Sequence, residues 1–255
     1  MSDLFRLDGK LALVTGASAG LGWHFAQVLA KAGAGVIVAA RRTDRLQGLV
    51  EAITAAGGTA VAVELDVSDA KSVHAAFETM VGTIGTPDII VNNAGISIVK
   101  PLLEHDESDW DSVIDTNLKG VWLVATEAAR RMVAAGIPGS IINIASILGE
   151  RVAGGIAPYA VSKAGVVQAT KAMALELARH RIRVNAILPG YIATDINRDF
   201  LTSDAGERLR ARIPSRKFGE PEDLDGPLLL LASDAGRAMS GATIAVDGAH
   251  LVSGL

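Results

Sequence analysis

LALVTGASAGLG, residues 11–22, is the stretch that decides the fold. Apolar and β-branched residues run directly into a glycine-rich turn, and a helical pattern begins behind it. In open α/β sheets, ligands bind at the carboxyl ends of the strands, and phosphates sit at the N-terminus of the following helix. The glycines Gly16, Gly20 and Gly22 follow a G-x-x-x-G-x-G spacing rather than G-x-G-x-x-G. An ordinary glycine-rich turn after a strand therefore remains an alternative.

Short runs of apolar and β-branched residues recur outward from this stretch, with helical patterns between them. The strand candidates are residues 10–16, 35–40, 59–67, 88–95, 140–146, 183–190 and 243–248. Their apolar residues are continuous rather than alternating, which is typical of a parallel sheet covered on both faces. The pattern predicts an α/β fold with a doubly wound parallel sheet of about seven strands, helices on both faces and right-handed crossovers.

The helical patterns include residues 24–33, which end on a glycine as a C-terminal stop, and two long stretches over 109–134 and 158–180. No linker, low-complexity tract or fixed-period repeat divides the chain, so we expect a single domain over residues 1–255. The segment at about 191–219 departs from the alternation of apolar strand candidates and helical patterns because it is polar. It predicts a mobile substrate lid between two strands.

The composition argues against several classes of function. The net charge is −4 with acidic and basic residues interspersed, so we expect no nucleic-acid partner. No apolar run approaches the ~18 residues of a membrane span, and residues 1–10 lack the apolar region of a signal peptide. We therefore expect no membrane association and a cytoplasmic location. The absence of cysteine excludes disulfides, thiolate metal sites and cysteine nucleophiles, and we expect no metal site.

Two arginines follow the strand candidate at residues 35–40. NAD-selective sites place a carboxylate near this strand end to bind the ribose 2′-hydroxyl, whereas an arginine accommodates a 2′-phosphate. Because Arg41 and Arg42 stand here and no acid does, they indicate a preference for NADP(H). The alternative is a pair of solvated arginines before a helix that starts near Thr43. Cations at a helix start oppose the macrodipole, which argues against that alternative.

Asp66 ends the third strand candidate. Its carboxylate can accept a hydrogen bond from the amino group of a bound adenine. The alternative is an aspartate that shapes the turn, with Ser68 as the N-cap of the next helix. The residues leave both interpretations open.

Tyr159 and Lys163 are four residues apart, so their side chains project from one face of one helix. Lowering the pKa of a phenol from about 10 to about 8 requires roughly 2.7 kcal/mol. One cation about 4 Å away supplies roughly 4 kcal/mol at an effective dielectric constant near 20. The pair can therefore make Tyr159 an acid and base. The alternative is a half-buried ring beside a lysine that extends to solvent.

Several motifs occur in a specific order along the chain: TGASAGLG at 15–22, NNAG at 92–95, Asn117, Ser146, YAVSK at 159–163 and Pro189-Gly190. The set resembles the short-chain dehydrogenase/reductase family, in particular its 3-oxoacyl-reductase-like and carbonyl-reductase-like members. The resemblance covers essentially the whole chain. It implies a Rossmann-type sheet with strand order 3-2-1-4-5-6-7 and a nicotinamide cofactor.

The resemblance also implies the roles of four catalytic residues. Tyr159 would exchange the proton with the substrate oxygen, and Ser146 would hydrogen-bond that oxygen. Lys163 would lower the phenol pKa and hold the nicotinamide ribose. Asn117 would help to order a water that relays protons to Lys163, at a local kink of the long helix over 109–134. Without the resemblance, Asn117 would be interpreted as a surface or bend residue.

The residues that would bind the cofactor lie at the carboxyl ends of the strand candidates. They are Gly16, Ser18, Ala19, Gly20, Leu21, Gly22, Arg41, Arg42, Asp66, Val67, Asn93, Ala94, Gly95, Tyr159, Lys163, Pro189, Gly190, Ile192 and Thr194. Many NADP-preferring members of the family carry a basic residue where this chain has Ala19. Only one of two possible clamps for the 2′-phosphate is present, so use of NAD(H) stays open beside NADP(H).

Mainly apolar residues flank these motifs and would form the substrate pocket. They are Ile96, Ile98, Leu148, Val152, Ile156 and Tyr191, together with Ser146 and Tyr159. The pocket predicts a small-molecule ketone or secondary alcohol with an apolar or acyl portion. We therefore predict an NAD(P)(H)-dependent oxidoreductase of CH–OH and C=O groups.

Three other functions remain open. A 3-oxoacyl-(acyl-carrier-protein) reductase needs basic residues near the cleft, for which Arg130, Arg131 and residues 179–181 are candidates; these cations can equally offset helix dipoles. A polyol or sugar dehydrogenase would require a more polar pocket than the mainly apolar one predicted here. A non-catalytic dinucleotide sensor could use the same fold, but it need not keep Ser146, Tyr159, Lys163 and Asn117 together.

The family resemblance also implies assembly. We expect a homotetramer, or a homodimer, built through the two long helices over 109–134 and 158–180. The apolar stretch at 228–232 and the C-terminal HLVSGL at 250–255 are further interface candidates.

Overall fold

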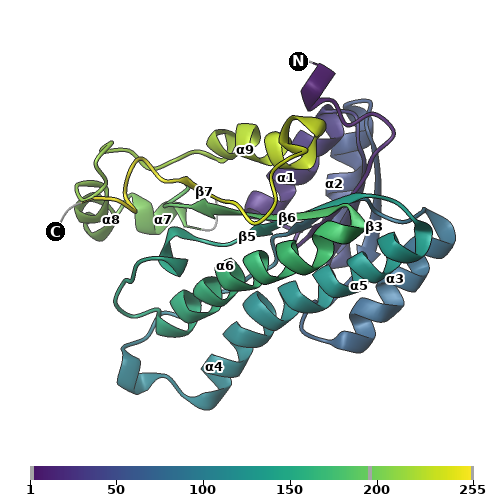
Figure 1. Ribbon diagram of the computed structural model, residues 1–255. Coiled ribbons are helices and arrows are strands. Elements are labelled where there is room, and N and C mark those ends of the chain that lie inside the picture. The colour runs from purple at the N-terminus through teal and green to yellow at the C-terminus, as the bar shows by residue number, and fades with distance from the viewer. Residues whose placement is uncertain (1–2, 195–196, 254–255) are drawn as a thin grey trace.

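The computed structural model describes residues 3–194 and 197–253. Seven strands lie within these residues, and they form one parallel sheet in the order β3-β2-β1-β4-β5-β6-β7 (Figure 1). The strands are β1 Leu11–Thr15, β2 Gly35–Ala40, β3 Thr59–Glu64, β4 Ile89–Asn92, β5 Gly139–Ile144, β6 Ile182–Pro189 and β7 Thr243–Val246. The predicted strand order and sheet class are confirmed.

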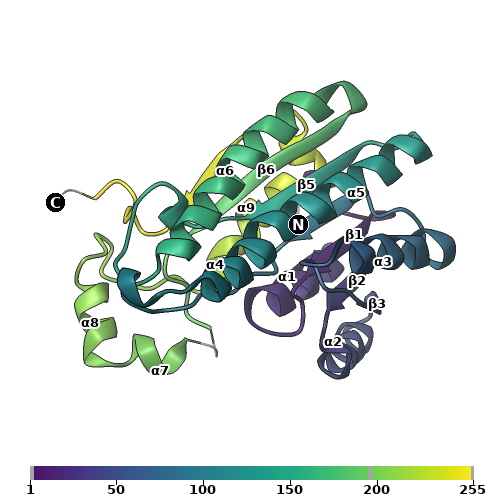
Figure 2. The same cartoon turned by 90° about the horizontal axis from the view of Figure 1, so that it is seen from below.

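Helices cover both faces of the sheet, as Figure 1 shows. On one face lie α1, α2 and α9, and on the other lie α3, α5 and α6, with α4 continuing the line of α5 (Figure 2). The bounds are α1 Gly20–Lys31, α2 Thr43–Ala55, α3 Ala70–Thr83, α4 Glu107–Ile114, α5 Gly120–Ala135, α6 Ala157–Leu177, α7 Arg198–Leu201, α8 Asp204–Arg210 and α9 Asp225–Ala232.

The core has a layer on each side of the sheet, because successive strand residues point to opposite faces. In β1, Ala12 and Val14 join the cluster under α1 and α9, whereas Leu13 joins the cluster under α3 and α5. The apolar stretch 228–232 belongs to the first cluster, with Leu228 and Leu231 fully buried. Leu228 and Leu231 pack against the chain's own α1 and β5 and are therefore not interface material, whereas Leu230 is only partly buried.

The long helical pattern at 109–134 is divided in two. Between α4 and α5, residues Asp115–Lys119 form a π-helical turn, in which the Gly120 N–H donates to the Asp115 carbonyl five residues earlier. A π-turn inside an α-helix commonly marks a functional site. At the predicted kink the structure shows an interruption of the α-helical hydrogen bonds, and α4 still continues the line of α5 (Figure 2). The alternative of a surface residue at Asn117 is wrong because Asn117 is fully buried.

The segment 191–219 holds two short helices, α7 and α8, and lies at one end of the sheet beside the C-terminal residues (Figure 1). A parallel bridge between Ile192 and Gly219 ties the two ends of the segment together. The backbone bonds are Gly219 N–H to the Tyr191 carbonyl, 2.9 Å, and Ala193 N–H to the Gly219 carbonyl, 2.7 Å. Residues 195–196 of this predicted lid lie outside the described residues.

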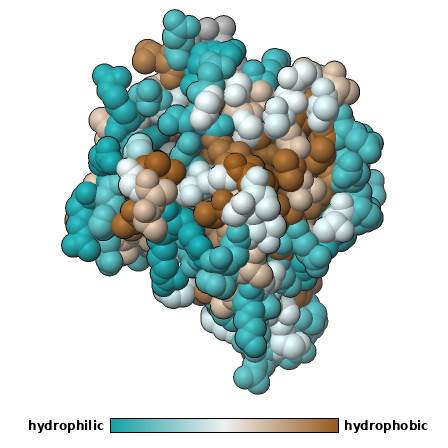
Figure 3. Space-filling model, turned by 90° about the vertical axis from the view of Figure 1, so that its right-hand side faces the viewer, coloured by the Kyte–Doolittle hydropathy of each residue, from teal (hydrophilic) through white to brown (hydrophobic). Residues whose placement is uncertain are grey.

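Hydrophobic side chains gather in one area of the face shown in Figure 3, and hydrophilic residues border that area. Individual apolar residues are also exposed on the helix layer that contains α4, α5 and α6. They include Trp110 on α4, Trp122 on α5 and Leu175 on α6. Over residues 3–194 and 197–253, no helix combines the length and the apolar character that crossing a bilayer requires.

Candidate active site

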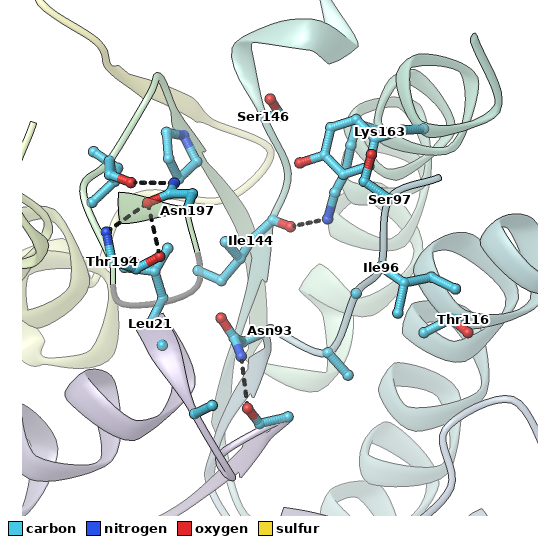
Figure 4. Close-up of a pocket in the computed structure, with 18 of the residues that line it drawn as sticks. Leu21, Asn93, Ile96, Ser97, Thr116, Ile144, Ser146, Lys163, Thr194 and Asn197 are labelled. Atoms are coloured by element: carbon cyan, nitrogen blue, oxygen red, sulfur yellow. Dashed lines mark hydrogen bonds between the residues drawn. The ribbon is translucent and has the colours of Figure 1, made fainter. Parts of the chain in front are cut away.

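A cavity of about 1100 Å³ opens at the carboxyl ends of the strands (Figure 4). Because these ends meet at one edge of a parallel sheet, loops far apart in sequence converge there. The cavity brings together most of the residues that the sequence predicts: Gly16, Ser18, Ala19, Gly20, Leu21, Arg41, Arg42, Asp66, Val67, Asn93, Ala94, Gly95, Ile96, Ser146, Leu148, Ile156, Tyr159, Lys163, Pro189, Gly190, Tyr191, Ile192 and Thr194.

The glycine turn lies at one end of the cavity. Gly16 has φ +66°, a left-handed conformation, and a Cβ there would lie 2.8 Å from the Ala94 Cα. At the start of α1, the N-cap Ala19 makes no side-chain hydrogen bond to the first helical turn. Backbone N–H groups of that turn therefore remain for a ligand, and a helix N-terminus favours an anion. The turn fits the pyrophosphate of the predicted dinucleotide.

Gly22 does not line the cavity, in contrast to its predicted role in binding the cofactor. It is buried in the first turn of α1, where a Cβ would collide with the Gly16 carbonyl oxygen and lie 2.5 Å from Asn93 Nδ2. Asn93 Nδ2 in turn donates to the Thr15 carbonyl at 3.0 Å. Gly22 therefore acts through packing, since it lets α1 approach the ends of β1 and β4.

The two arginines after β2 differ in their contacts. Arg42 Nη2 donates to Ser18 Oγ in the glycine turn at 3.1 Å, whereas Arg41 only approaches Asp66, with Nη1 3.9 Å from Oδ2. A guanidinium therefore reaches the glycine turn although Ala19 supplies no charge there. Both arginines line the cavity at the edge where a ribose 2′-phosphate would lie.

Asp66 lies beyond the end of β3, and its Oδ1 accepts hydrogen bonds from Ser68 N at 2.9 Å and Ser68 Oγ at 2.6 Å. Burial alone would raise the pKa of this carboxyl, but the Ser68 bonds and the nearby Arg41 hold it below its ordinary value. The turn-shaping interpretation is supported, although Asp69 and not Ser68 is the N-cap of α3. Asp66 also lines the cavity, so a role toward adenine is compatible with it.

Ser146 and Tyr159 lie at the other end of the cavity. Ser146 follows β5 and caps a short 3-10 helix, since its Oγ accepts the Leu148 N–H at 3.1 Å. Tyr159 is in the first turn of α6. Burial raises the pKa of the Tyr159 phenol, and the nearby Ser146 side chain partly opposes this shift. Serine and phenol are thus paired at one point of the cavity, where one substrate oxygen can meet both.

Lys163 lies one turn further along α6 and is almost completely buried. Its Nζ donates to the carbonyl of Ile144, the last residue of β5, at 2.8 Å, as Figure 4 shows. The same Nζ lies 5.5 Å from the centroid of the Tyr159 ring. Burial lowers the pKa of Lys163 to about 8. The alternative of a lysine that extends to solvent is therefore wrong.

Asn117 does not line the cavity but lies directly behind it. Its Oδ1 accepts the Ile96 N–H at 2.8 Å, and its Nδ2 donates to the Ile96 carbonyl at 2.9 Å and to Ser162 Oγ at 3.1 Å. Ser162 Oγ donates to the Tyr159 carbonyl at 2.7 Å. Asn117 thus joins the loop after β4 to the turn of α6 that carries Tyr159 and Lys163.

Two predicted substrate residues, Ile98 and Val152, do not line the cavity. Ser97 and Val99, on either side of Ile98, do line it. Val152 is 85% exposed, and Ala153 lines the cavity in its place. Sequence reasoning also missed several lining residues, for which neighbouring motifs were the only signal: Ala40, Leu65, Thr116, Ile144, Ala145, Ile147, Gly154, Asn197, Phe200 and Leu201.

Phe200 and Leu201 of helix α7 also line the cavity. Asn197 braces the turn before this helix: its Oδ1 accepts from Thr194 N at 2.9 Å and from Thr194 Oγ1 at 3.2 Å, and its Nδ2 donates to the Ile192 carbonyl at 2.9 Å (Figure 4). Within the part of the chain that the structure describes, no group of three or more His, Asp or Glu residues is placed to hold a metal ion.

Comparison with known proteins identifies close relatives. Residues 16–249 match the family model described as enoyl-(acyl carrier protein) reductase. The chain is 39% identical to 2-dehydro-3-deoxy-D-gluconate 5-dehydrogenase of Dickeya dadantii (strain 3937) over 254 residues, which cover 98% of each protein. It is 40% identical to the 3-oxoacyl-(acyl-carrier-protein) reductase FabG of Staphylococcus aureus over 240 residues, 94% of this chain and 97% of the relative.

The fold is also similar to that of solved structures. A gluconate 5-dehydrogenase from Burkholderia cenocepacia J2315, crystallised in complex with NADP and tartrate, superposes with a TM-score of 0.95. The two chains are 37% identical, and the match covers 99% of each. The likeness extends over the whole sheet and both helix layers, and therefore over the cavity that the strand ends form.

Proposed function

This chain belongs to the short-chain dehydrogenase/reductase family of NAD(P)-dependent enzymes that interconvert ketones and secondary alcohols, and we propose that Tyr159 is its general acid and base. The observation that carries the proposal is the pairing of Tyr159 with Ser146 at the substrate end of the cavity. One substrate oxygen that meets both groups gains a proton donor and a hydrogen-bond donor at the same point.

The residues of the cavity fit a nicotinamide dinucleotide along its length. The glycine turn would hold the pyrophosphate, Arg41 and Arg42 would hold the phosphate of the adenosine ribose, and residues 93–95 and 189–194 would flank the nicotinamide half. When bound, the cofactor supplies or accepts the hydride, and the protein supplies binding, orientation and proton transfer.

During ketone reduction, the Tyr159 hydroxyl donates its proton to the carbonyl oxygen, while the Ser146 hydroxyl donates a hydrogen bond to it. During alcohol oxidation, Tyr159 must first lose its proton and then accept the proton of the alcohol. Because burial raises the pKa of Tyr159, the phenol is protonated at neutral pH. Tyr159 is thus in the protonation state that ketone reduction requires.

Lys163 and Asn117 complete the proton route in this proposal. The Lys163 ammonium lies between the end of β5 and the Tyr159 ring, so it can support the phenolate and replace its proton. Asn117 holds the Ile96 backbone on one side and Ser162 on the other. It therefore keeps the loop after β4 at a set distance from α6, and water at the π-turn can connect Lys163 to solvent.

Replacing Tyr159 with Phe tests the proposal. We expect Tyr159→Phe to lower kcat by about 10²- to 10⁴-fold, the usual contribution of general acid–base catalysis. The affinity for NADPH, measured by calorimetric titration, should be unchanged, because the glycine turn lies at the other end of the cavity. Substantial turnover by the variant would reject Tyr159 as the acid and base. Turnover of any ketone by the wild type would reject the non-catalytic sensor.

We propose that NADP(H) is the preferred cofactor, with NAD(H) as a weaker one. Arg42 reaches the glycine turn through Ser18, and Arg41 is 71% exposed at the side-chain level with only a long contact to Asp66. Both are therefore available to a 2′-phosphate. The Burkholderia gluconate 5-dehydrogenase, 37% identical to this chain, was solved with NADP.

We propose a ketone or secondary alcohol of the sugar-acid type as the substrate, with a 3-oxoacyl substrate as the second candidate. Relatives named for gluconate derivatives support the first, and the FabG relative supports the second. Docking of an acidic carrier protein is weakly supported, because Arg131 is paired with Glu127 and Glu78, each at 2.6 Å, and Arg130 with Glu127 at 3.3 Å.

A substrate panel separates these candidates. Purified protein would be assayed with NADPH and NADH against 5-keto-D-gluconate, the substrate named for another relative, and against acetoacetyl esters. A kcat/KM for 5-keto-D-gluconate that exceeds that for the esters supports the sugar-acid assignment. The reverse order supports the 3-oxoacyl assignment, and inactivity with every ketone contradicts both.

We also propose that segment 191–219 acts as a substrate lid on a single domain, and that the chain assembles as a homotetramer or homodimer. Helix α7 of the segment lines the cavity.

The assembly would use exposed apolar surface. Trp110 on α4, Trp122 on α5 and Leu175 on α6 are exposed and supply apolar surface for an interface along those helices. Of the C-terminal interface candidate, Val252 is exposed, and residues 254–255 lie outside the described residues.

A further inference from the structure

A second tyrosine stands at the substrate end of the cavity. Tyr191 follows Pro189-Gly190 at the end of β6, next to the strand that leads to Ser146, and it lines the same cavity as Tyr159. A negative charge on Tyr191 would raise the pKa of Tyr159, so the two phenols are within electrostatic reach. The sequence already places Tyr191 in the pocket, but its hydroxyl has no role in the proton chemistry described above.

The ring of Tyr191 is fixed by a residue from the C-terminal segment. It packs on His250, with ring centroids 5.9 Å apart and planes tilted by 36°. Arg151 Nη1 donates to the His250 carbonyl and to Ser253 Oγ, the latter at 3.1 Å. Burial and the Arg151 cation lower the pKa of His250, so the packed ring is a neutral imidazole. Arg151 thus fastens the C-terminal segment over the ring, and the phenol is held in one place.

The hydroxyl of Tyr191, in contrast, has no hydrogen-bond partner among the described residues, and it is not sealed from the cavity. Burial raises the pKa of Tyr191, although Arg151 and Arg212 partly oppose the shift. The group is therefore a neutral donor at neutral and moderately alkaline pH. The surrounding walls are largely apolar, with Ile96, Leu148 and Ile156 among them.

We propose that Tyr191 determines specificity, and that its hydroxyl donates a hydrogen bond to a second oxygen of the substrate, carried within two carbons of the reacting carbonyl. The inference rests on the proposed function, because it assumes that a ketone binds at Ser146 and Tyr159. A polar group left unpaired in an apolar site costs free energy. A site built around such a donor rejects an analogue that lacks the matching oxygen. Hydroxyketones, keto sugar acids and 3-oxoacyl compounds carry that oxygen, and simple alkyl ketones do not.

The test compares Tyr191→Phe with the wild type on two matched pairs of ketones. Acetoin differs from butanone by one hydroxyl beside the carbonyl. Ethyl acetoacetate differs from methyl pentyl ketone, which has a chain of the same length, by an ester group in place of two methylene groups. Phenylalanine keeps the ring against His250. We expect kcat/KM to fall about tenfold for acetoin and ethyl acetoacetate, the effect of one hydrogen bond of about 1.4 kcal/mol. For butanone and methyl pentyl ketone it should change less than about twofold. An equal change within each pair would overturn the proposal and leave the proposed function intact.

A binding measurement in a background without turnover makes the test independent of catalysis. In the Tyr159→Phe variant saturated with NADPH, calorimetry with acetoin and butanone should show tighter binding of acetoin. Adding Tyr191→Phe should remove most of that difference. If acetoin has no advantage before the second substitution, or keeps all of it afterwards, Tyr191 does not select the second oxygen. Wild-type protein that turns over none of the four ketones would instead contradict the proposed function.

Discussion

At the scale of single residues, burial governs how the two central ionisable groups titrate. The Tyr159 phenol and the Lys163 ammonium both lose hydration in the site, and burial shifts each pKa toward the neutral form: up for the phenol and down, to about 8, for the lysine. The Lys163 Nζ lies near the face of the Tyr159 ring and donates to the Ile144 carbonyl. In this arrangement the cation does not overcome the burial of the phenol.

The raised pKa of Tyr159 predicts how the rate depends on pH. Alcohol oxidation needs the deprotonated phenol, whose population grows as the pH approaches the raised pKa from below. We therefore expect kcat/KM for oxidation to increase from pH 7 to pH 9. Reduction needs the protonated phenol, so its rate should be flat near neutral pH and fall only in alkali. Steady-state rates in both directions check this, and an oxidation rate that decreases from pH 7 to pH 9 would contradict it.

Arg41 and Arg42 predict a measurable cofactor preference. Arg41→Ala and Arg42→Ala should each raise the KM for NADPH by about tenfold or more, because hydrogen bonds to charged groups contribute about 1.5–3 kcal/mol. The KM for NADH should change little, since it carries no 2′-phosphate. Lys31→Ala is a matched control that removes one cation at the far end of α1. If NADPH and NADH are affected equally, the arginines do not bind the 2′-phosphate.

At the scale of elements, close packing between β1, α1 and β4 shapes the glycine turn. Gly22 lies on α1, but it determines how near the helix comes to the Gly16 carbonyl and to Asn93. The π-turn between α4 and α5 has a similar effect on the opposite layer, because it places Asn117 against both the loop after β4 and α6. Gly22 and Asn117 both position the site although neither lines the cavity.

Gly22→Ala tests the packing at this turn. The added methyl has no room, so we expect a loss of about 1–3 kcal/mol in the free energy of unfolding, the usual cost of overpacking. The affinity for NADPH should fall with it, because the turn must shift. Gly82→Ala in α3 is the control: a Cβ there meets nothing within 4 Å, so it should stabilise by about 0.5–1 kcal/mol. Urea unfolding measures the free energy of unfolding of both variants. An unchanged value for Gly22→Ala would show that α1 has room to move at this point.

At the scale of the whole molecule, the ends of strands β1 to β6 bring residues from separated segments to one edge of the sheet, and helices α5 and α6 expose apolar side chains. Trp122 is half exposed on α5, and Leu175 is 82% exposed on α6. Exposed apolar side chains of this size along two neighbouring helices favour an interface over solvent.

We expect Trp122→Asp and Leu175→Asp to reduce the native mass of the assembly, because a charge buried in an interface has no partner. Val61→Asp, on the edge strand β3, serves as the control and should leave the mass unchanged. Sedimentation velocity gives the mass, and circular dichroism shows whether each variant is folded. A wild-type monomer would reject the assembly proposal.

The sequence by itself determined the fold class, the strand order through the family resemblance, and the place of the site. Continuous apolar strands, glycine stops and motif order are local patterns, and the carboxyl ends of parallel strands must meet at one edge. The same logic located most of the cavity residues, from Gly16 to Thr194. The family resemblance, and not the local pattern, indicated an irregularity of the helix at Asn117.

Only the tertiary structure decided which side chains are buried and what they touch. It turned Val99 toward the cavity and Val152 toward solvent. It placed Leu228, Leu229 and Leu231 in the core and Lys163 beside the ring of Tyr159. It also set His250 against Tyr191, a contact between residues far apart in sequence. Burial and the pKa shifts it causes depend on neighbours from distant segments, so no local pattern can report them.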